Sequence, residues 1–191
     1  MSRTRRSARR SAGVLLAAGL LALGYAAYVV VDAKAYQAIE QRRFERARAD
    51  RTAAPALVDG GSIGEIRISR LGVRAIIVQG DSEAILQRAV GHVADTALPG
   101  EAGNVVLAGH RDTFFRPLKR VRAGDAITLS TRDGDFEYRV ESTAVVPPGD
   151  LRVLQPTGGR TLTLITCFPF SYLGAAPDRF IVRARQTEGP P

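Results

Sequence analysis

Apolar and polar residues alternate over short stretches beyond Gly61, and glycine or proline interrupts them. This alternation, rich in β-branched residues, is typical of strands packed on one face. The predicted strands are Ile63–Ile68, Val73–Val78, Asn104–Ala108, Ala126–Ser130, Phe136–Val146, Arg160–Cys167 and Arg179–Arg185. A helical segment at 81–90 opens with an Asp-Ser cap, and 114–121 reads as a loop or short helix. About eight short strands with few helices predict an all-β barrel or sandwich.

The N-terminal part has a different pattern, because Ala12–Val31 is an uncharged run of twenty residues. As a helix it would span about 30 Å, the thickness of a bilayer core. A cleaved signal peptide is the alternative, since the run is rich in small residues. However, the run exceeds the usual apolar region of a signal peptide, and Asp32 and Lys34 follow it directly. We therefore predict an uncleaved signal-anchor.

Residues 32–60 contain helix formers with interleaved charges and then an Ala/Pro-rich stretch near Pro55. This composition predicts a solvated helical stalk that ends in a linker, with a helix packed on the domain as the alternative. The expected organisation is a basic cytoplasmic tail (1–11), a transmembrane signal-anchor (12–31), the stalk and linker (32–60), a β-barrel domain (61–187) and a C-terminal tail (188–191).

The formal net charge of +8 is concentrated at the N-terminus. Residues 1–10 carry +5, residues 11–60 carry +1, and the rest of the chain carries +2. The β domain is thus nearly neutral, which argues against nucleic-acid binding. Five arginines ahead of the apolar run predict a cytoplasmic N-terminus, with the β domain outside the cytoplasm.

Other chemistries find little support in the residues. One cysteine permits no disulfide within the chain, and His92 and His110 lack the spacing of a metal site. The His-Arg-Asp at 110–112 is similar to a kinase catalytic loop, but Pro117 replaces the metal-binding asparagine of that motif. The chain also lacks a phosphate-binding loop, so we discard a kinase.

The remaining candidates are Cys167, a histidine and Arg179. A thiolate is the reactive form of cysteine, and a neighbouring imidazole can take its proton and return it to a leaving amine. Attack on an amide develops an oxyanion that a guanidinium can stabilise. Arg179 opens the strand after Cys167, so pairing of the two strands would bring them together. The alternative is a buried structural cysteine with a solvated arginine.

The sequences "TLITC" ending at Cys167 and "PGEAGNVVLAGHRD" containing His110, with Arg179 opening the next strand, closely resemble the sortase family. The resemblance covers Ile63–Arg185, and the N-terminal anchor fits it. The stretch following the cysteine looks most like the class D branch, which includes forms from Gram-negative bacteria.

This resemblance implies a closed sortase-type β-barrel and a cysteine transpeptidase. Cys167 would be the nucleophile, His110 the general acid/base, and Arg179 the stabiliser of the substrate carbonyl and its oxyanion. The substrate would be an LPxTG-like C-terminal sorting signal, cleaved through a thioacyl-enzyme, and an envelope amine would accept the protein. We expect no cofactor, and the charge distribution and ligand spacing described above lead us to expect no nucleic-acid partner and no metal. The resemblance places the chain in the cell (inner) membrane as a single-pass protein, with its domain in the periplasm in a Gram-negative cell.

Three further residues are expected to contact substrate. Thr166 precedes the nucleophile and is otherwise an ordinary strand residue. His92 would support the site or the substrate groove, and otherwise lies at the surface. Phe168 heads an aromatic group with Phe170 and Tyr172 that would wall the groove or belong to the core.

Two other functional classes remain open at this point. A cysteine hydrolase on the same scaffold would release its peptide to water, and an added amine would not change its product. A non-catalytic membrane-tethered binding module would keep Cys167 packed, and a thiol-directed probe would then fail to label the folded domain.

Overall fold

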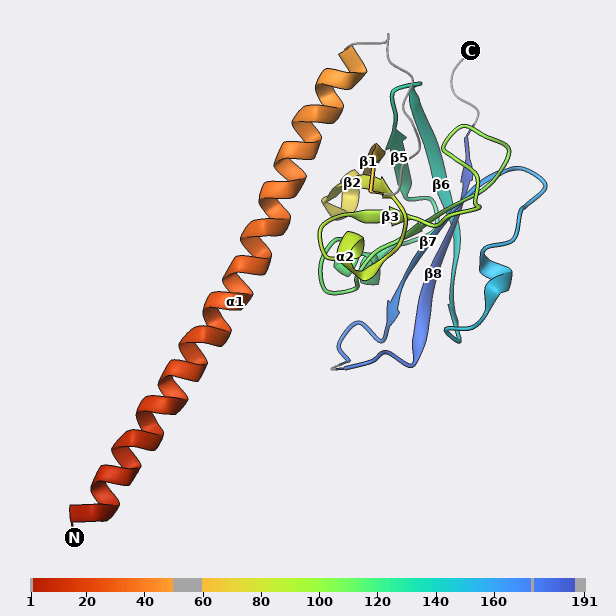
Figure 1. Ribbon diagram of the computed structural model, residues 1–191. Helices are drawn as coiled ribbons and strands as arrows, with labels where there is room; N and C mark the ends of the chain where they lie inside the picture. The colour runs from red at the N-terminus through yellow and green to blue at the C-terminus, as the bar shows by residue number, and fades with distance from the viewer. Residues whose placement is uncertain (1, 50–59, 173, 188–191) are drawn as a thin grey trace. The chain divides into compact units, whose positions relative to one another are not determined.

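The computed structural model describes the backbone of residues 2–49, 60–172 and 174–187, and side chains from Gly13 onward within these ranges (Figure 1). The linker expected near Pro55 and the tail expected at 188–191 lie outside the described residues. The chain divides into one unit that ends at Tyr36 and a second that begins at Gln37.

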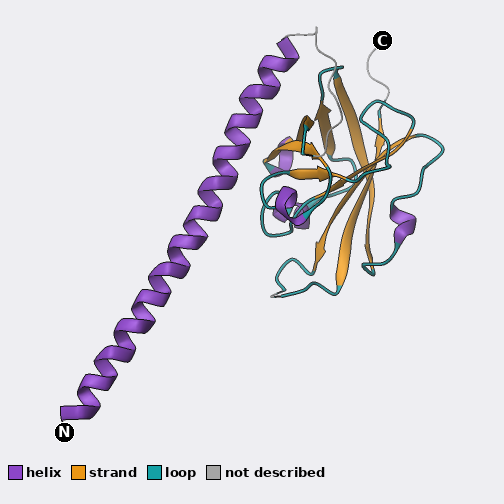
Figure 2. Ribbon diagram, in the orientation of Figure 1, coloured by secondary structure: helices purple, strands orange, loops and turns teal. Residues whose placement is uncertain are grey.

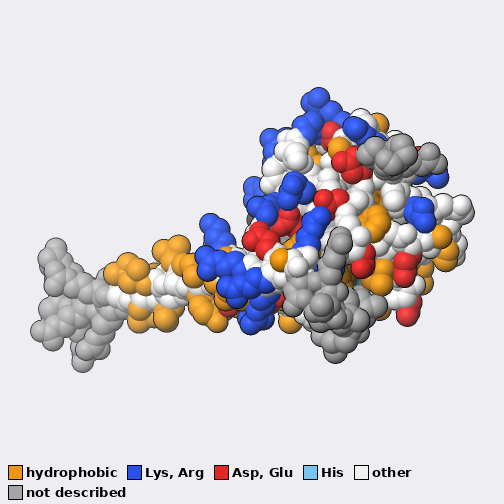
Figure 3. Space-filling view, turned by 90° about the horizontal axis from the view of Figure 1, so that it is seen from above, with side chains coloured by type: hydrophobic (Ala, Val, Ile, Leu, Met, Phe, Trp, Pro, Cys, Tyr) orange, Lys and Arg blue, Asp and Glu red, His pale blue; other side chains and the backbone are white. Residues whose placement is uncertain are grey.

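Helix α1 (Ser2–Ala49) contains the uncharged run. The apolar side chains of this run are exposed, Leu15 and Leu21 among them, and they form the orange surface along the helix in Figure 3. From Gly13 to Ala49 this is the one helix in the described part of the chain that is long and apolar enough to cross a membrane. Length and composition therefore fit the predicted anchor, although a signal sequence has the same properties.

The end of α1 belongs to the second unit. The Gln37 side chain accepts a hydrogen bond from the backbone N–H of Ile76 (2.9 Å) and donates one to the carbonyl of Arg88 (2.7 Å). Phe44 is buried, in contrast to the apolar residues of the first unit. This part of the helix, expected to be solvated, contacts the strands that follow it.

Eight strands form a closed barrel, seen as orange arrows in Figure 2. Their bounds are β1 Ser62–Ile68, β2 Val73–Gln79, β3 Val90–His92, β4 Gly103–Ala108, β5 Ala126–Ser130, β6 Asp135–Val146, β7 Arg160–Phe168 and β8 Asp178–Gln186. The order around the barrel is β1-β2-β3-β4-β7-β8-β6-β5. Closure leaves no unpaired edge, so the predicted all-β barrel is confirmed.

Neighbouring strands are antiparallel except for two parallel pairs, β2 with β3 and β4 with β7. Short helices lie in the connections: η1 Ser69–Leu71, α2 Glu83–Leu86, η2 Arg116–Arg120 and η3 Leu151–Val153. The parallel β4–β7 pair matters most for the site, because parallel strands end at the same side of a sheet.

The sequence-based prediction is wrong between residues 81 and 92. The expected helix is a single turn, α2, and an unpredicted strand, β3, follows it. Val90 and Gly91 pair with Ile77 and Val78 of β2 in parallel register. A Cβ on Gly91 would lie 2.4 Å from the carbonyl oxygen of Gly80, so the pairing needs glycine here. This long-range contact outweighs the local helical propensity.

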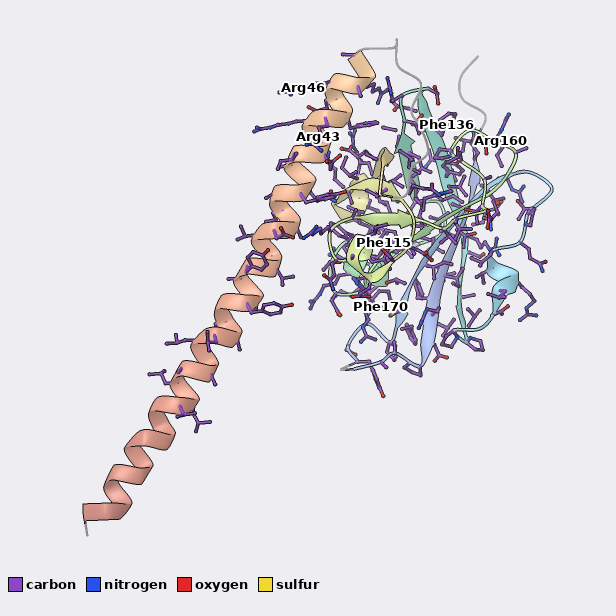
Figure 4. The ribbon with its side chains drawn as sticks, viewed as in Figure 1. Arg43, Arg46, Phe115, Phe136, Arg160 and Phe170 are labelled. Atoms are coloured by element: carbon purple, nitrogen blue, oxygen red, sulfur yellow. The ribbon has the colours of Figure 1, made fainter. Side chains whose placement is uncertain are left out.

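Side chains of alternate residues fill the barrel. On β7, Leu162 and Leu164 point into the core, and on β8 Val182 and Ala184 do so. Phe115, labelled in Figure 4, is fully buried in the same core. Since side chains alternate across a strand, Cys167 and Arg179 lie on the opposite, outward side of β7 and β8.

Candidate active site

The strand register brings Cys167 and Arg179 together. Strands β7 and β8 are antiparallel, and Cys167 is the direct partner of Arg179. Side chains of directly opposed residues lie on the same face, with Cβ atoms about 5 Å apart. The expected pairing of the two strands is therefore confirmed, and Cys167 is a free, half-buried thiol.

The end of β4 brings His110 to the same place. Ala108 is the partner of Ile165 on β7, and His110 and Cys167 each lie two residues further on. Two hydrogen bonds extend the contact beyond the last paired residues. The Gly109 N–H donates to the Ile165 carbonyl (3.1 Å), and the Thr166 hydroxyl donates to the Gly109 carbonyl (2.7 Å). These bonds fix the strand end that carries the histidine to the strand that carries the cysteine.

Gly109 must be a glycine for this arrangement. A Cβ at this position would lie 2.7 Å from the ring of Phe115, which is fully buried and cannot move aside. The close approach of the backbone to the core thus directs the chain from β4 toward the outer face, where His110 is 30% exposed.

His110, Cys167 and Arg179 line one open cavity of about 370 Å³ on the outer face of the barrel. Its floor is formed by residues of the barrel strands, including Ala108, Ile165 and Ile181. The segment between β6 and β7 supplies an apolar wall, formed by Pro147, Pro148, Leu151, Val153 and Leu154. The cavity is therefore apolar along one wall and carries its reactive groups at the strand ends.

A buried amide holds that wall to the barrel. Asn104 of β4 is only 2% exposed, and its Nδ2 donates to the carbonyls of Val153 (2.9 Å) and Gln155 (3.3 Å). Its Oδ1 accepts hydrogen bonds from the hydroxyls of Thr161 (3.3 Å) and Thr163 (2.7 Å) of β7. With both ends of the amide engaged, Asn104 connects β4 and β7 to the segment that forms the cavity wall.

Three carboxylates and one guanidinium line the cavity. Glu83 of α2 has Oε1 at 3.3 Å from Nε2 of His110, and its side chain is 71% exposed. Asp81 lines the cavity beside it, and the neighbouring Arg152 holds the pKa of Asp150 below its usual range. Arg179 donates from Nη1 to the carbonyls of Ala176 (3.4 Å) and Asp178 (3.1 Å).

The structure does not bring His92 into the cavity. It is 2% exposed in β3, with Nδ1 2.9 Å from Gln79 Oε1 and Nε2 3.0 Å from the Ala97 carbonyl. Burial lowers the pKa of His92, and the Ala97 carbonyl partly offsets this effect. The surface alternative is therefore wrong, and a direct substrate contact does not fit a side chain enclosed in this way.

Phe168 does not line the cavity either. Its ring packs near Phe170 (centroids 6.1 Å apart) and Phe180 (6.2 Å), and those two rings pack against the barrel core. Figure 4 labels Phe170 at this position near the β7–β8 connection. The position of Phe168 therefore matches the core alternative rather than the groove wall. Thr166 does border the cavity, but its hydroxyl is engaged by the Gly109 carbonyl.

Sequence reasoning missed three residues that shape this site: Glu83, Asn104 and Arg111. Asn104 carried a signal, because a polar residue opens a strand that is otherwise apolar. Arg111 was considered only within the His-Arg-Asp motif, and Glu83 was assigned to a helix with no link to the site. The described residues contain no group of three or more His, Cys, Asp or Glu side chains arranged to hold a metal.

Comparisons with known proteins agree on one family. The family model described as "Sortase domain" matches residues 66–187. The chain is 30% identical over 188 residues to Sortase D of Bacillus subtilis, and this alignment covers 90% of this chain and 95% of that protein. It superposes on a Clostridium perfringens Sortase D5 transpeptidase with a TM-score of 0.68 and 29% identity, covering 81% of this chain and 98% of that one. For Sortase A from Corynebacterium diphtheriae the TM-score is 0.64 and the identity 30%, covering 70% of this chain and 64% of that one.

Proposed function

The chain belongs to the sortase family of cysteine transpeptidases, and we propose that it cleaves an LPxTG-like signal near the C-terminus of an exported protein. Sortases act on sorting-signal proteins and on amine acceptors. The observation that carries the proposal is that Cys167, His110 and Arg179 line one cavity. In the proposed reaction the cleaved exported protein is then transferred to an amine of the cell envelope.

In the first half-reaction His110 takes the proton of the Cys167 thiol, and the sulfur attacks the scissile carbonyl and forms a C–S bond. The carbonyl oxygen becomes an oxyanion, which the Arg179 guanidinium stabilises. As the C–N bond breaks, His110 donates a proton to the departing amine, and a thioester remains on Cys167. The direct pairing of Cys167 with Arg179 supports this division of roles, because both groups then reach one carbonyl.

In the second half-reaction an acceptor amine attacks the thioester carbonyl. His110 takes the proton that the amine loses, a new C–N bond forms, and the C–S bond breaks to return the free cysteine. The half-exposed position of His110 supports this step, because the incoming amine must reach the imidazole.

The cavity wall supports recognition of an apolar signal. Leu151, Val153 and Leu154 offer aliphatic side chains on the wall, and Leu151 is largely exposed. Covering this surface with apolar residues of a peptide would stabilise the complex by about 25 cal/mol per Å² removed from water.

We also propose that α1 anchors the protein by a single membrane span, with the N-terminus in the cytoplasm and the barrel outside it. The apolar run within α1 and the arginines that precede that run support this orientation. A reporter fused after Pro191 should be active only outside the cytoplasm. Activity of that fusion in the cytoplasm, or a mature N-terminus near Asp32, would contradict the anchor.

The proposed reaction is tested with an LPxTG peptide, with and without an added amine such as hydroxylamine or triglycine. The full chain in detergent should convert the peptide to the amine conjugate, and Cys167→Ala should not. Release of the hydrolysed peptide alone, unchanged by the amine, would assign the chain to hydrolysis rather than transfer.

A further inference from the structure

Arg111 is a buried arginine that the reaction described above does not use. Its side chain is almost fully enclosed, with 6% of the residue exposed. Its guanidinium donates to three backbone carbonyls: Nη1 to Pro169 (3.1 Å), and Nη2 to Tyr172 (2.7 Å) and Gly174 (3.0 Å). A buried charge is costly unless it is well hydrogen-bonded, so these carbonyls compensate for its removal from water.

All three acceptors lie in the connection between β7 and β8. That connection runs from the end of β7 at Phe168 to the start of β8 at Asp178, so Cys167 lies one residue from one end and Arg179 one residue from the other. A single side chain thus fixes the backbone at three points between the two reactive residues. The Arg111 Cζ atom also lies 5.9 Å from the centre of the Tyr172 ring, which adds a contact to the same segment.

Arg179 donates from Nη1 to the carbonyl of Ala176, near the end of the same connection, and to that of Asp178, the first residue of β8. The two guanidiniums therefore hold the backbone at different points between Cys167 and Arg179. Without Arg111, the carbonyls of Tyr172 and Gly174 would lose the side-chain donor that holds them, and the segment that leads to Arg179 would lose this attachment.

Arg111 also follows His110 directly in the chain. The preceding Gly109 is bonded to β7 through Ile165 and Thr166, so the segment 109–111 contacts β7 before Cys167 and the connection after it. Arg111 therefore attaches the segment that carries His110 to the connection that links Cys167 with Arg179.

We propose that Arg111 is a positioning residue that holds the β7–β8 connection so that Arg179 stays aligned with Cys167. It acts through Arg179 and does not itself touch substrate. This inference rests on the roles proposed above for Cys167 and Arg179. Lysine cannot replace Arg111, because its single ammonium cannot reach three separated carbonyls as a planar guanidinium does.

The test is a double-substitution cycle on the full chain in detergent. Single-turnover formation of the thioacyl-enzyme from an LPxTG peptide is measured for wild type, Arg111→Lys, Arg179→Lys and the double variant. Arg139→Lys is the matched control, because Arg139 also donates to a backbone carbonyl, that of Gly124 (3.1 Å), from an exposed position. Alkylation of Cys167 by iodoacetamide and the midpoint of thermal unfolding are recorded for each protein.

We expect Arg111→Lys to slow acylation about 10- to 100-fold, the loss that follows when charge-assisted hydrogen bonds are broken. Alkylation should stay within about threefold of wild type, because a small electrophile does not need Arg179. The double variant should acylate about as slowly as Arg179→Lys alone, since residues that act as a unit are not additive. Arg139→Lys should match wild type.

Two results would overturn the inference. Acylation by Arg111→Lys at the wild-type rate would show that the connection does not depend on Arg111. Losses that multiply in the double variant would show that Arg111 acts independently of Arg179, as a purely structural residue would. Failure of the proposed function gives a different result, since wild type itself would then form no acyl adduct.

Discussion

Asn104→Ala tests whether a buried amide controls the wall of the substrate cavity. The substitution removes two hydrogen bonds donated to the β6–β7 segment, at Val153 and Gln155, and the acceptor of the Thr163 hydroxyl. The Thr161 hydroxyl also loses Asn104 but keeps the Gly103 carbonyl as an acceptor, so three bonds are lost without replacement. Each buried hydrogen bond contributes about 1 kcal/mol, so we expect a loss of about 3 kcal/mol in unfolding free energy. For a unit of this size that corresponds to a decrease of about 6 to 12 °C in the unfolding midpoint.

The functional effect should appear in substrate binding. Val153 and Leu154 line the cavity, and release of their segment would raise KM for the peptide about 10-fold while kcat changes less. Thr163→Val is the matched control, because it removes one partner of Asn104 but leaves both bonds to the segment. It should lower the midpoint with KM unchanged.

The assay combines thermal unfolding with initial rates over a range of peptide concentrations. Our reasoning would be refuted if both variants lowered the midpoint and neither raised KM. The wall would then keep its position without Asn104, and the amide would serve stability alone.

The remaining predictions concern the histidines and one ion pair. His110→Ala should reduce the rate of acylation on the order of 10²- to 10⁴-fold, as loss of acid–base catalysis does. His92→Ala should mainly lower the unfolding midpoint, because His92 is enclosed and hydrogen-bonded. Pre-steady-state kinetics and calorimetry measure the two effects, and exchanged phenotypes would show that His110 is not the base. Arg70 donates to Asp125 and holds the pKa of Asp125 below its usual range, so the carboxylate should stabilise the fold above about pH 4 and progressively less as the pH falls further. Asp125→Asn should therefore lower the unfolding free energy more at pH 7 than at pH 3 in urea unfolding, and an equal loss at both values would contradict the ion-pair explanation.

Local patterns were sufficient for most of the barrel. Alternating residues and turn residues identified seven of its strands, and the strand that ends near Cys167 was placed to within one residue. The order Cys167, turn, Arg179 also predicted the direct pairing of these residues, because two antiparallel strands joined by a short connection pair side by side.

Interactions between distant segments were not visible in the sequence. Strand β3 has only three residues, and its pairing with β2 depends on the close approach of Gly91 to Gly80. The contacts of Arg111 join residues about 60 positions apart, and a basic residue after a histidine gives no sign of its acceptors. His92 was assigned to the site from the family resemblance and Phe168 from its position next to Cys167, whereas the structure encloses His92 in the barrel and packs Phe168 against Phe170 and Phe180.

The central claim is that Cys167 is the nucleophile of a transpeptidase site in which Arg179 stabilises the oxyanion. Mass mapping of the protein quenched during a single turnover with an LPxTG peptide tests this claim most directly. We predict one acyl adduct, on Cys167, that disappears on addition of an amine and forms about 10²-fold more slowly in Arg179→Lys, comparable to the loss of one oxyanion donor. An adduct on any other residue, or acylation of Arg179→Lys at the wild-type rate, would contradict it.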